Sequence, residues 1–314
     1  MKKELGIFIL LVVLCAVTAT INPRFLSSAN LTNMANVIGL FGVFSLGLGL
    51  VIITSGIDLS VGSMCALTGI VLSMALTEWK WAWPLAVIVV ALIPMVLGWA
   101  HGALITRMKM QPFIVTLCGL LLYRGIARFI AGDSTKGFGD PTNFATLRQL
   151  ASGKFLGLPM PFVALIVVGT ILWVLLHRSV YGRYLLAVGR NEEAARFSGI
   201  NTNLVITAAY VIAGLLTGIS GIMIAFYTNS VSPSNHGNFY ELYGIAAAVL
   251  GGCSLRGGEG SIIGIIIGTA LLQVLQNLVN LLGIPSSLNF AVMGAVVLLG
   301  VLADQLLRQR ARTV

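Results

Sequence analysis

The chain contains very little charge. Only 9% of its 314 residues are Asp, Glu, Lys or Arg, and 57% are hydrophobic. A soluble domain is about a quarter charged, because its surface faces water. The mean hydropathy of +0.97 leads to the same conclusion. This composition excludes an ordinary soluble protein and indicates a chain that lies mostly in a lipid bilayer.

Several patterns that carry chemistry are also missing. The four cysteines have neither zinc-ligand spacing nor the paired loop positions of a disulfide framework, so we expect them to be small buried hydrophobic residues. No Ser/His/Asp set, carboxylate pair or metal cluster is visible. The chain is therefore not expected to be an enzyme or to hold a metal or cofactor of its own.

Signs of a nucleotide or nucleic-acid partner within the chain are absent as well. Although the net charge is +9, the basic residues are scattered rather than gathered in a stripe, which argues against nucleic acid. The sequence contains no Gly-x-x-x-x-Gly-Lys-Ser/Thr loop, and its longest hydrophilic stretch, 131–160, is too short for a nucleotide-binding domain. If ATP drives this protein, another chain must bind it.

What the sequence does contain is a series of apolar segments. Since about 20 residues span the hydrocarbon core, we predict an all-α polytopic membrane protein, a single domain over 1–314 with about ten transmembrane helices. The predicted segments are 5–21, 33–54, 61–76, 83–105, 113–130, 161–176, 204–227, 242–252, 262–282 and 289–306. A polar loop, 131–160, and a charged loop, 178–203, separate the longer runs.

Basic residues in the loops predict the orientation. With the N-terminus in the cytoplasm, twelve of the 19 Lys and Arg residues fall in inner loops and ends and five in outer loops, the asymmetry expected of cytoplasmic loops. Both termini are therefore predicted to be cytoplasmic. An alternative for the start is a cleaved signal, Lys2-Lys3 followed by an apolar core and the small residues 16–19. Cleavage would leave nine spans.

The stretch Ser55–Ser63 separates two apolar runs without a normal connecting loop. Its Asp58 is the single carboxylate that we place inside the membrane, where a charge costs roughly 2.5–3.5 kcal/mol. One interpretation is structural, with Ser55 or Asp58 capping the next helix of a broken pair. The others are that Asp58 and Ser60 contact a permeant, or that Asp58 binds a coupling ion.

Amide side chains form a stripe on segment 262–282. Spacings of three and four residues place them on one helical face; they are Gln273, Gln276, Asn277 and Asn280. They either join helices by hydrogen bonds or line a water-filled path, where neutral amides would suit a sugar or another neutral polar solute. Asn33 and Asn36 open segment 33–54 similarly, either on that path or at its outer interface.

Other polar residues in the membrane favour a structural interpretation. Arg124 and Arg128 face one way near a helix end, and we expect them to extend to the interface rather than to bind an anion. His101 is expected to be a packed or interfacial histidine. Gly98–Pro112 and Gly268–Pro285 share a loose plan of a glycine-containing helix, a turn and another helix. An inverted repeat of the transporter type is one interpretation.

The charged loop 178–203 predicts a short helix. Asn191 is placed to cap it, Glu192 and Glu193 occupy its first turn, Arg196 lies towards its end, and Gly199 is placed to end it. These charges complement the helix dipole, so helix stability alone could explain them. Alternatively, a cytoplasmic helix between two long spans is suited to receive force from a partner.

Glu193-Ala194-Ala195-Arg196-Phe197-Ser198-Gly199 resembles the E-A-A-x-x-x-G loop of binding-protein-dependent ABC permeases. Three further stretches are similar to ribose-type sugar permeases. They are Tyr181–Tyr184 with Ala187–Glu193, Thr54–Ser63, and Gly251–Gly258. In combination, these motifs resemble that family over nearly the whole chain.

The resemblance implies a permease subunit of the bacterial inner membrane that pairs with a second permease subunit, either a copy or a paralogue. It also implies a cytoplasmic ABC ATPase that holds the ATP and magnesium, and a periplasmic sugar-binding protein. Residues 190–199 would form the coupling helix, in which Arg190, Asn191, Glu192, Glu193, Ala194, Ala195, Arg196 and Gly199 are the expected docking residues. The cargo is expected to be a neutral sugar-like solute.

Two other functions remain open from the sequence. An ion-coupled secondary transporter would use Asp58 for a proton or sodium ion. A non-transporting membrane scaffold would need the amide stripe only for packing.

Overall fold

The computed structural model describes residues 2–140 and 142–285, together with 288, 291, 292, 294, 295 and 298. The helices in this part of the chain are α1 (Lys2–Ile21), α2 (Ser28–Ile53), α3 (Val61–Thr77), α4 (Trp83–Arg107), α5 (Pro112–Ala131), α6 (Ala145–Ser152), α7 (Met160–His177), α8 (Val180–Arg190), α9 (Glu192–Phe197), α10 (Thr202–Thr228), α11 (Tyr240–Leu250) and α12 (Ile262–Leu281). Two 3₁₀ turns, η1 (Pro23–Leu26) and η2 (Thr142–Phe144), add to them. The strands are β1 (Lys136–Gly137), β2 (Lys154–Phe155), β3 (Leu158–Pro159) and β4 (Ser230–Val231).

The all-α membrane architecture predicted from the composition is confirmed. Within the described residues, seven helices are long and apolar enough to cross a bilayer, namely α1, α2, α4, α5, α7, α10 and α12. Shorter apolar helices, α3 and α11, coincide with two more predicted segments. The tenth predicted segment, 289–306, lies outside the continuously described residues. The inverted repeat stays a prediction.

The two polar loops contain more structure than their composition indicates. Loop 131–160 holds the short helix α6 and the antiparallel β2–β3 pair. Loop 178–203 holds α8 as well as the predicted short helix. Both missed helices are amphipathic and bury small apolar sets, Leu147 in α6 and Leu185 in α8. Tertiary burial rather than length therefore stabilises them.

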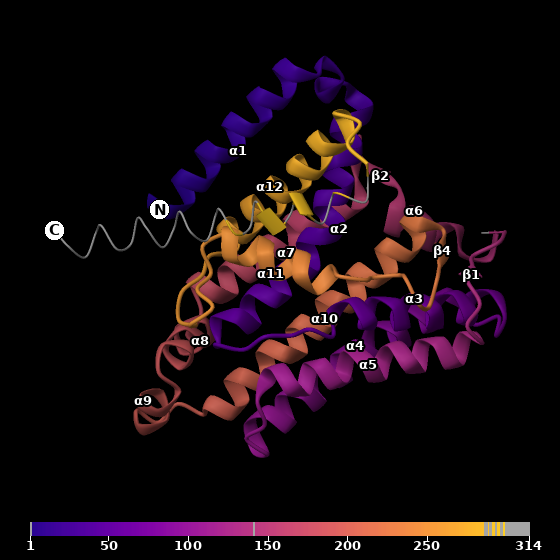
Figure 1. Ribbon diagram of the computed structural model, residues 1–314. Helices are drawn as coiled ribbons and strands as arrows, with labels where there is room; N and C mark the ends of the chain where they lie inside the picture. Colours follow the sequence, from indigo (N-terminus) through magenta and orange to yellow (C-terminus); the bar gives the residue numbers. More distant parts are fainter. Residues whose placement is uncertain are drawn as a thin grey trace.

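Helices α2 and α10 form the centre of the molecule. About four fifths of each transmembrane window (78%) is buried, and α10 packs against α2, α3 and α4 (Figure 1). Glycines allow this close approach: a Cβ on Gly214 of α10 would overlap the Pro94 carbonyl of α4. By contrast, only 6% of the α1 window is buried, and α1 lies along α12 at the edge of the bundle.

The second half of the chain contains a re-entrant segment. After α10, β4 pairs with β1, and the chain then turns back so that the Gly237 carbonyl lies against Gly62, in the first turn of α3. Helix α11 starts from there and has 11 residues, which span about 16 Å. That length is about half of the hydrocarbon core. Helix α11 is therefore a half-helix rather than the full span predicted at 242–252; the break that the sequence predicted lies between α2 and α3.

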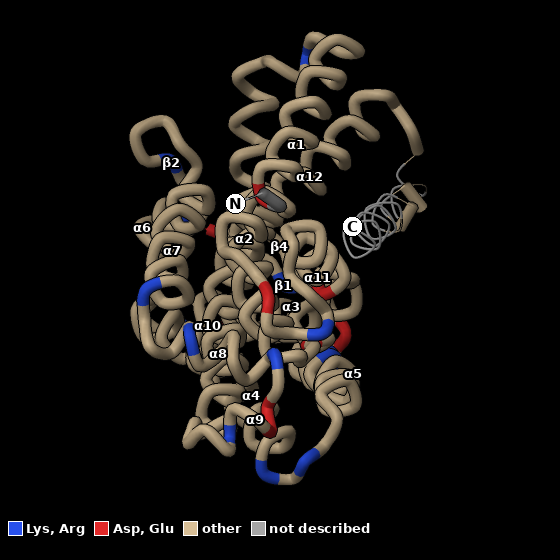
Figure 2. Tube along the Cα trace, turned by 90° about the vertical axis from the view of Figure 1, so that its left-hand side faces the viewer, with Lys and Arg blue, Asp and Glu red and all other residues tan. Residues whose placement is uncertain are grey.

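Contacts between loops show which loops lie at the same end of the bundle. On one face, which we call the α9 face, the connections 54–60, 108–111, 178–201 and 251–261 contact one another, through Ser55 and Gly189 and through Lys109 and Glu192. On the other, the hairpin face, Lys136 pairs with Glu78 and Arg148 bonds Asn229. The charged residues concentrate in such loops and at helix ends (Figure 2). This grouping agrees with the alternation predicted from loop charge; which face is cytoplasmic stays a prediction.

Candidate functional site

The predicted short helix on the α9 face is present. Asn191 is the N-cap of α9, and its side-chain oxygen accepts a hydrogen bond of 2.9 Å from the Ala194 amide. Glu192 and Glu193 lie in the first turn, and Arg196 lies in the last. Gly199 follows with a φ of +84°, the left-handed conformation that ends many helices. The sequence thus specified both ends of this helix.

The α9 helix is presented to solvent with a defined orientation. Of the eight predicted docking residues, Ala195 is buried, whereas Arg190, Asn191, Glu192, Glu193, Ala194, Arg196 and Gly199 are exposed. Glu192 lies 3.8 Å from the Lys109 ammonium in the α4–α5 turn and accepts a hydrogen bond from Thr202. These contacts connect α9 to the α4–α5 turn and to the first residue of α10.

Sequence reasoning missed two features of this face. Phe197 ends α9 with 82% of its surface exposed, and Met108 in the neighbouring α4–α5 turn is 68% exposed. Their apolar character was visible in the sequence, but their exposure was not.

Helix α8 connects α7 to α9. Its Tyr181 hydroxyl donates to the Val205 carbonyl at 3.2 Å. Burial raises the pKa of the Tyr181 phenol above its usual range.

Asp58 and Ser60 lie together at the start of α3. One Asp58 carboxylate oxygen accepts hydrogen bonds from the Ser60 amide at 2.8 Å and from the Ser60 hydroxyl at 2.6 Å, and both residues are buried. Neither Asp58 nor Ser55 caps α3 as expected, because Ser60 itself occupies the N-cap position. Asp58 instead fixes the turn that leads into the helix. Its contact with a permeant stays a prediction.

Asp58 is not the only buried carboxylate, contrary to the sequence analysis. Glu241, in the first turn of α11, is 7% exposed. A Cβ placed on Gly62 would lie 2.6 Å from its Oε2 atom, so Glu241 lies against the first turn of α3. The predicted segment started at Leu242, and this placed Glu241 in a loop. The sequence did not reveal that the loop folds back into the bundle.

The predicted amides divide between two helices that face each other. Asn277 of α12 and Asn30 of α2 exchange two hydrogen bonds, of 3.1 and 2.8 Å. This reciprocal pair agrees with the helix-joining interpretation of Asn277, and Asn30 was missed. The Asn33 side-chain oxygen accepts from Tyr227 at 3.3 Å.

The remaining amides differ in their surroundings. Gln273 is buried, Gln276 is half-buried and Asn280 is exposed. The buried side-chain oxygen of Asn36 has no hydrogen-bond partner among the described residues. The structure therefore gathers amides at the hairpin-face ends of α2 and α12 and leaves Asp58 and Ser60 at the other end of α2. A path lined by Asn33, Asn36, Gln273, Gln276, Asn277 and Asn280 stays a prediction.

Three other expectations can be compared with the structure. Arg124 does not extend to the interface: its guanidinium donates to the carbonyls of Pro233 and His236, at 3.0 and 2.6 Å, and so holds the re-entrant segment. Arg128 is exposed and pairs with Asp133. His101 is packed, as predicted, with its Nε2 atom 2.7 Å from the Tyr123 hydroxyl. The expectation for Cys118 was wrong, because this cysteine is exposed.

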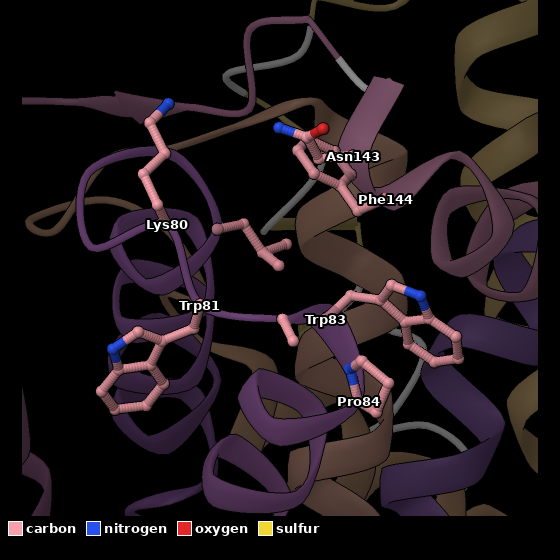
Figure 3. Close-up of a pocket in the computed structure, with 8 residues that line it drawn as sticks. Lys80, Trp81, Trp83, Pro84, Asn143 and Phe144 are labelled. Carbon is pink, nitrogen blue, oxygen red and sulfur yellow. The ribbon is translucent and has the colours of Figure 1, made fainter.

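A pocket of about 390 Å³ lies on the hairpin face, where the α3–α4 turn approaches η2. Trp81 and Trp83 lie on its two sides, and Asn143 and Phe144 lie above it (Figure 3). The predicted pathway residues do not line it. Tryptophans beside Lys80 at the end of two transmembrane helices are typical of a membrane–water interface. We therefore interpret this feature as an interfacial anchor.

Comparisons with known proteins give a consistent result. The family of permease components of the branched-chain amino acid transport system matches residues 30–301. The chain is 38% identical over 304 residues to the ribose import permease RbsC of Bacillus subtilis, covering 96% of this chain and 93% of the relative. No matching solved structure was found.

Two sugar permeases of Escherichia coli K12 are also similar. The galactose/methyl galactoside import permease MglC is 32% identical, with 97% of this chain and 94% of the relative covered. The xylose permease XylH is 31% identical, with 98% and 94% covered. The match extends from α2 to beyond α12 and includes every motif discussed above. The chain belongs to this family of transport-system permeases, the membrane-spanning components of ABC importers.

Proposed function

We propose that this chain forms the membrane pathway of an ATP-driven importer for a neutral sugar or sugar-like solute. The observation that carries the proposal is similarity over nearly the whole chain to import permeases for ribose, galactose and xylose. The scarcity of charge agrees with a neutral cargo. Amide side chains on α2 and α12 offer donors and acceptors that suit hydroxyl groups without requiring charge.

The proposal includes the partners of such a system. A second permease subunit, identical or a paralogue, would complete the pathway. A periplasmic sugar-binding protein would deliver the solute, and a cytoplasmic ATPase would bind ATP and magnesium. The chain would lie in the bacterial inner membrane with both termini in the cytoplasm, so that the α9 face meets the ATPase.

Helix α9 is the proposed docking element for the ATPase. It combines an exposed aromatic side chain, Phe197, with charges of both signs and with the exposed Met108 nearby. A large apolar side chain surrounded by polar residues is typical of an interface centre. The ion pair of Glu192 with Lys109 holds the α4–α5 turn beside α9, so the proposed surface includes both.

Solute competition tests the cargo class. The complete importer, reconstituted with its ATPase and binding protein, should take up a labelled pentose or hexose. An excess of the unlabelled sugar should compete, and leucine should not. Because the family carries the name of branched-chain amino acid transport, competition by leucine but not by any sugar would contradict the proposal.

Neither the structure nor the comparisons support the ion-coupled alternative. Asp58 is engaged by the amide and hydroxyl of Ser60, and the relatives described above are import permeases. A scaffold without transport activity is tested by replacing Gln273, Gln276, Asn277 and Asn280 with Leu. Uptake should then fall, whereas a scaffold would tolerate the change.

A further inference from the structure

The last turn of α2 meets two other segments on the α9 face. These are the end of α8 and the loop that follows α11, residues 251–261. We call this meeting point the α2–α8 junction and define it by Ile53, Ser55, Gly189 and the stretch Arg256–Gly258. The three segments are far apart in the sequence, and each contains one of the motifs singled out above. None of these junction contacts follows from the role proposed for α9.

Ser55 contacts both of the other segments at this junction, and its side chain lies on the exposed side. Its hydroxyl lies 2.9 Å from the Gly189 carbonyl and 2.8 Å from the Arg256 carbonyl, so one donor is shared between two backbone acceptors. The Gly258 amide donates to the Ile53 carbonyl at 2.8 Å. Ser55 itself has a φ of +64°. This left-handed conformation is uncommon for non-glycine residues, and at Ser55 it accompanies the two contacts of the hydroxyl.

Apart from the Ser55 hydroxyl, the groups that meet at the junction belong to the backbone. A Cβ on Gly189 would overlap the Ile53 carbonyl oxygen, and a Cβ on Gly257 would overlap the Ser55 hydroxyl. Gly257 and Gly258 both have positive φ, at +78° and +71°. A contact made by backbones has no rotamers through which it could yield, so a displacement of one segment is passed to the others.

Short stretches of chain join the junction to α9 on one side and to the first turn of α3 on the other. On one side, Gly189 is followed by Arg190 and by Asn191, the cap of α9. On the other side, the connection 54–60 runs from Ser55 to Asp58, whose carboxylate fixes the first turn of α3. The Tyr210 hydroxyl of α10 donates to the Ile57 carbonyl in the same connection, at 3.1 Å. Figure 1 shows this connection beside α8.

We propose that Ser55 is a positioning residue that passes movement of α9 to the α2–α3 connection. This inference rests on the proposed function, because it needs an ATPase that moves α9. Ser55 holds the end of α8 against α2 and against the loop 251–261, so α8, α2 and this loop shift together. Without the Ser55 hydroxyl, the ATPase would still dock on α9, but movement of α9 would reach Asp58 and α3 inefficiently.

The test is the number of solute molecules transported per ATP hydrolysed by the reconstituted complete importer. Ser55→Ala should lower this ratio measurably, by at most about fivefold, because the lost hydrogen bonds are made by one exposed hydroxyl, while co-purification of the ATPase stays unchanged. Thr54→Val is the matched control: it removes the neighbouring hydroxyl, which bonds only to Val51 within the same turn. The ratio of solute to ATP measured with Thr54→Val should equal that of the unchanged chain.

A second variant separates the hydroxyl from backbone strain. Ser55→Gly also removes the hydroxyl but accepts the left-handed conformation freely, so it should fold and should lower the ratio as Ser55→Ala does. A ratio equal to that of Thr54→Val in both variants would overturn the proposal. Loss of ATPase co-purification would overturn it too, because the hydroxyl would then serve docking. Failure of the proposed function would be seen separately, as ATP-independent uptake by the unchanged chain.

Discussion

The two ends of α2 are attached to the bundle in different ways. At the hairpin face, the side chains of Asn30 and Asn277 form a reciprocal amide pair between α2 and α12. At the α9 face, the backbone of Ile53 and the hydroxyl of Ser55 contact backbone groups of Gly189 and of the loop 251–261. A side-chain pair can be exchanged for apolar packing, whereas glycine-lined backbone contacts cannot.

This difference indicates separate roles for the two ends. The Asn30–Asn277 pair stabilises the packing of α2 against α12, and apolar side chains could replace it. The junction connects the end of α8, and through it the proposed docking helix α9, to the α2–α3 connection. The comparison predicts that changes at the α2–α8 junction affect coupling to the ATPase, and that loss of the Asn30–Asn277 pair affects stability without changing the coupling ratio.

The largest effect is expected from Gly189→Ala. Its methyl group would overlap the Ile53 carbonyl, and over-packing of this kind costs roughly 1–3 kcal/mol. Thermal unfolding in detergent should show the loss, and uptake should fall below that of Ser55→Ala. Gly125→Ala is the control, because its Cβ would meet no atom within 4 Å. If Gly189→Ala unfolds and transports like Gly125→Ala, the junction is not rigid.

The next effect is expected from Phe197→Ala. An aromatic anchor at an interface centre contributes about 2 kcal/mol or more, so ATPase association, measured by titration, should weaken about thirtyfold or more. Thermal stability should not change, since Phe197 is 82% exposed. Leu156→Ala, at a residue 89% exposed on the hairpin face, is the matched control. Equal affinity of both variants would contradict docking through α9.

A smaller effect is expected from Asn277→Leu. Interhelical hydrogen bonds in membranes contribute about 0.6 kcal/mol on average and at most about 1.7, so the melting temperature should fall slightly. The ratio of solute to ATP should be unchanged. Adding Asn30→Leu should restore only a small part of the stability, because it removes the unpaired amide but also the Asn30 hydrogen bond to the Phe25 carbonyl. A lowered ratio in these variants would remove the distinction between the two ends of α2.

The smallest change concerns the thiol of Cys253, beside the junction. Burial raises its pKa to about 12, and the thiolate is the reactive form. In a chain that retains only this cysteine, maleimide labelling near pH 7 should be slow and should rise with pH. Gly189→Ala should accelerate labelling by opening the junction. Fast labelling of the chain with Gly189 intact would show that the junction is already open.

Local patterns in the sequence were enough to predict much of the fold. Long apolar runs identified the membrane helices, because a bilayer requires a fixed length of apolar chain. Asn191 and Gly199 predicted both ends of α9, because capping depends on neighbouring residues. Helices α6 and α8 were missed, since short helices are stabilised by burial that no local pattern reveals.

The site was harder to predict because it depends on contacts between distant residues. Ser55 meets Gly189 and Arg256 across 134 and 201 positions. The sequence identified each of the three motifs but not their meeting. Glu241 and Arg124 were misassigned for the same reason: the re-entrant segment that surrounds them is held by contacts with α3 and α5. Apolar length alone cannot distinguish such a segment from a loop.

ATP dependence of uptake tests the central claim most directly. Proteoliposomes would contain this chain with or without its ATPase, would be supplied with the binding protein, and would have no proton or sodium gradient. The account predicts sugar uptake only when the ATPase and ATP are both present, and its loss when Phe197→Ala weakens docking. Uptake by the chain alone, driven by an imposed ion gradient, would contradict it.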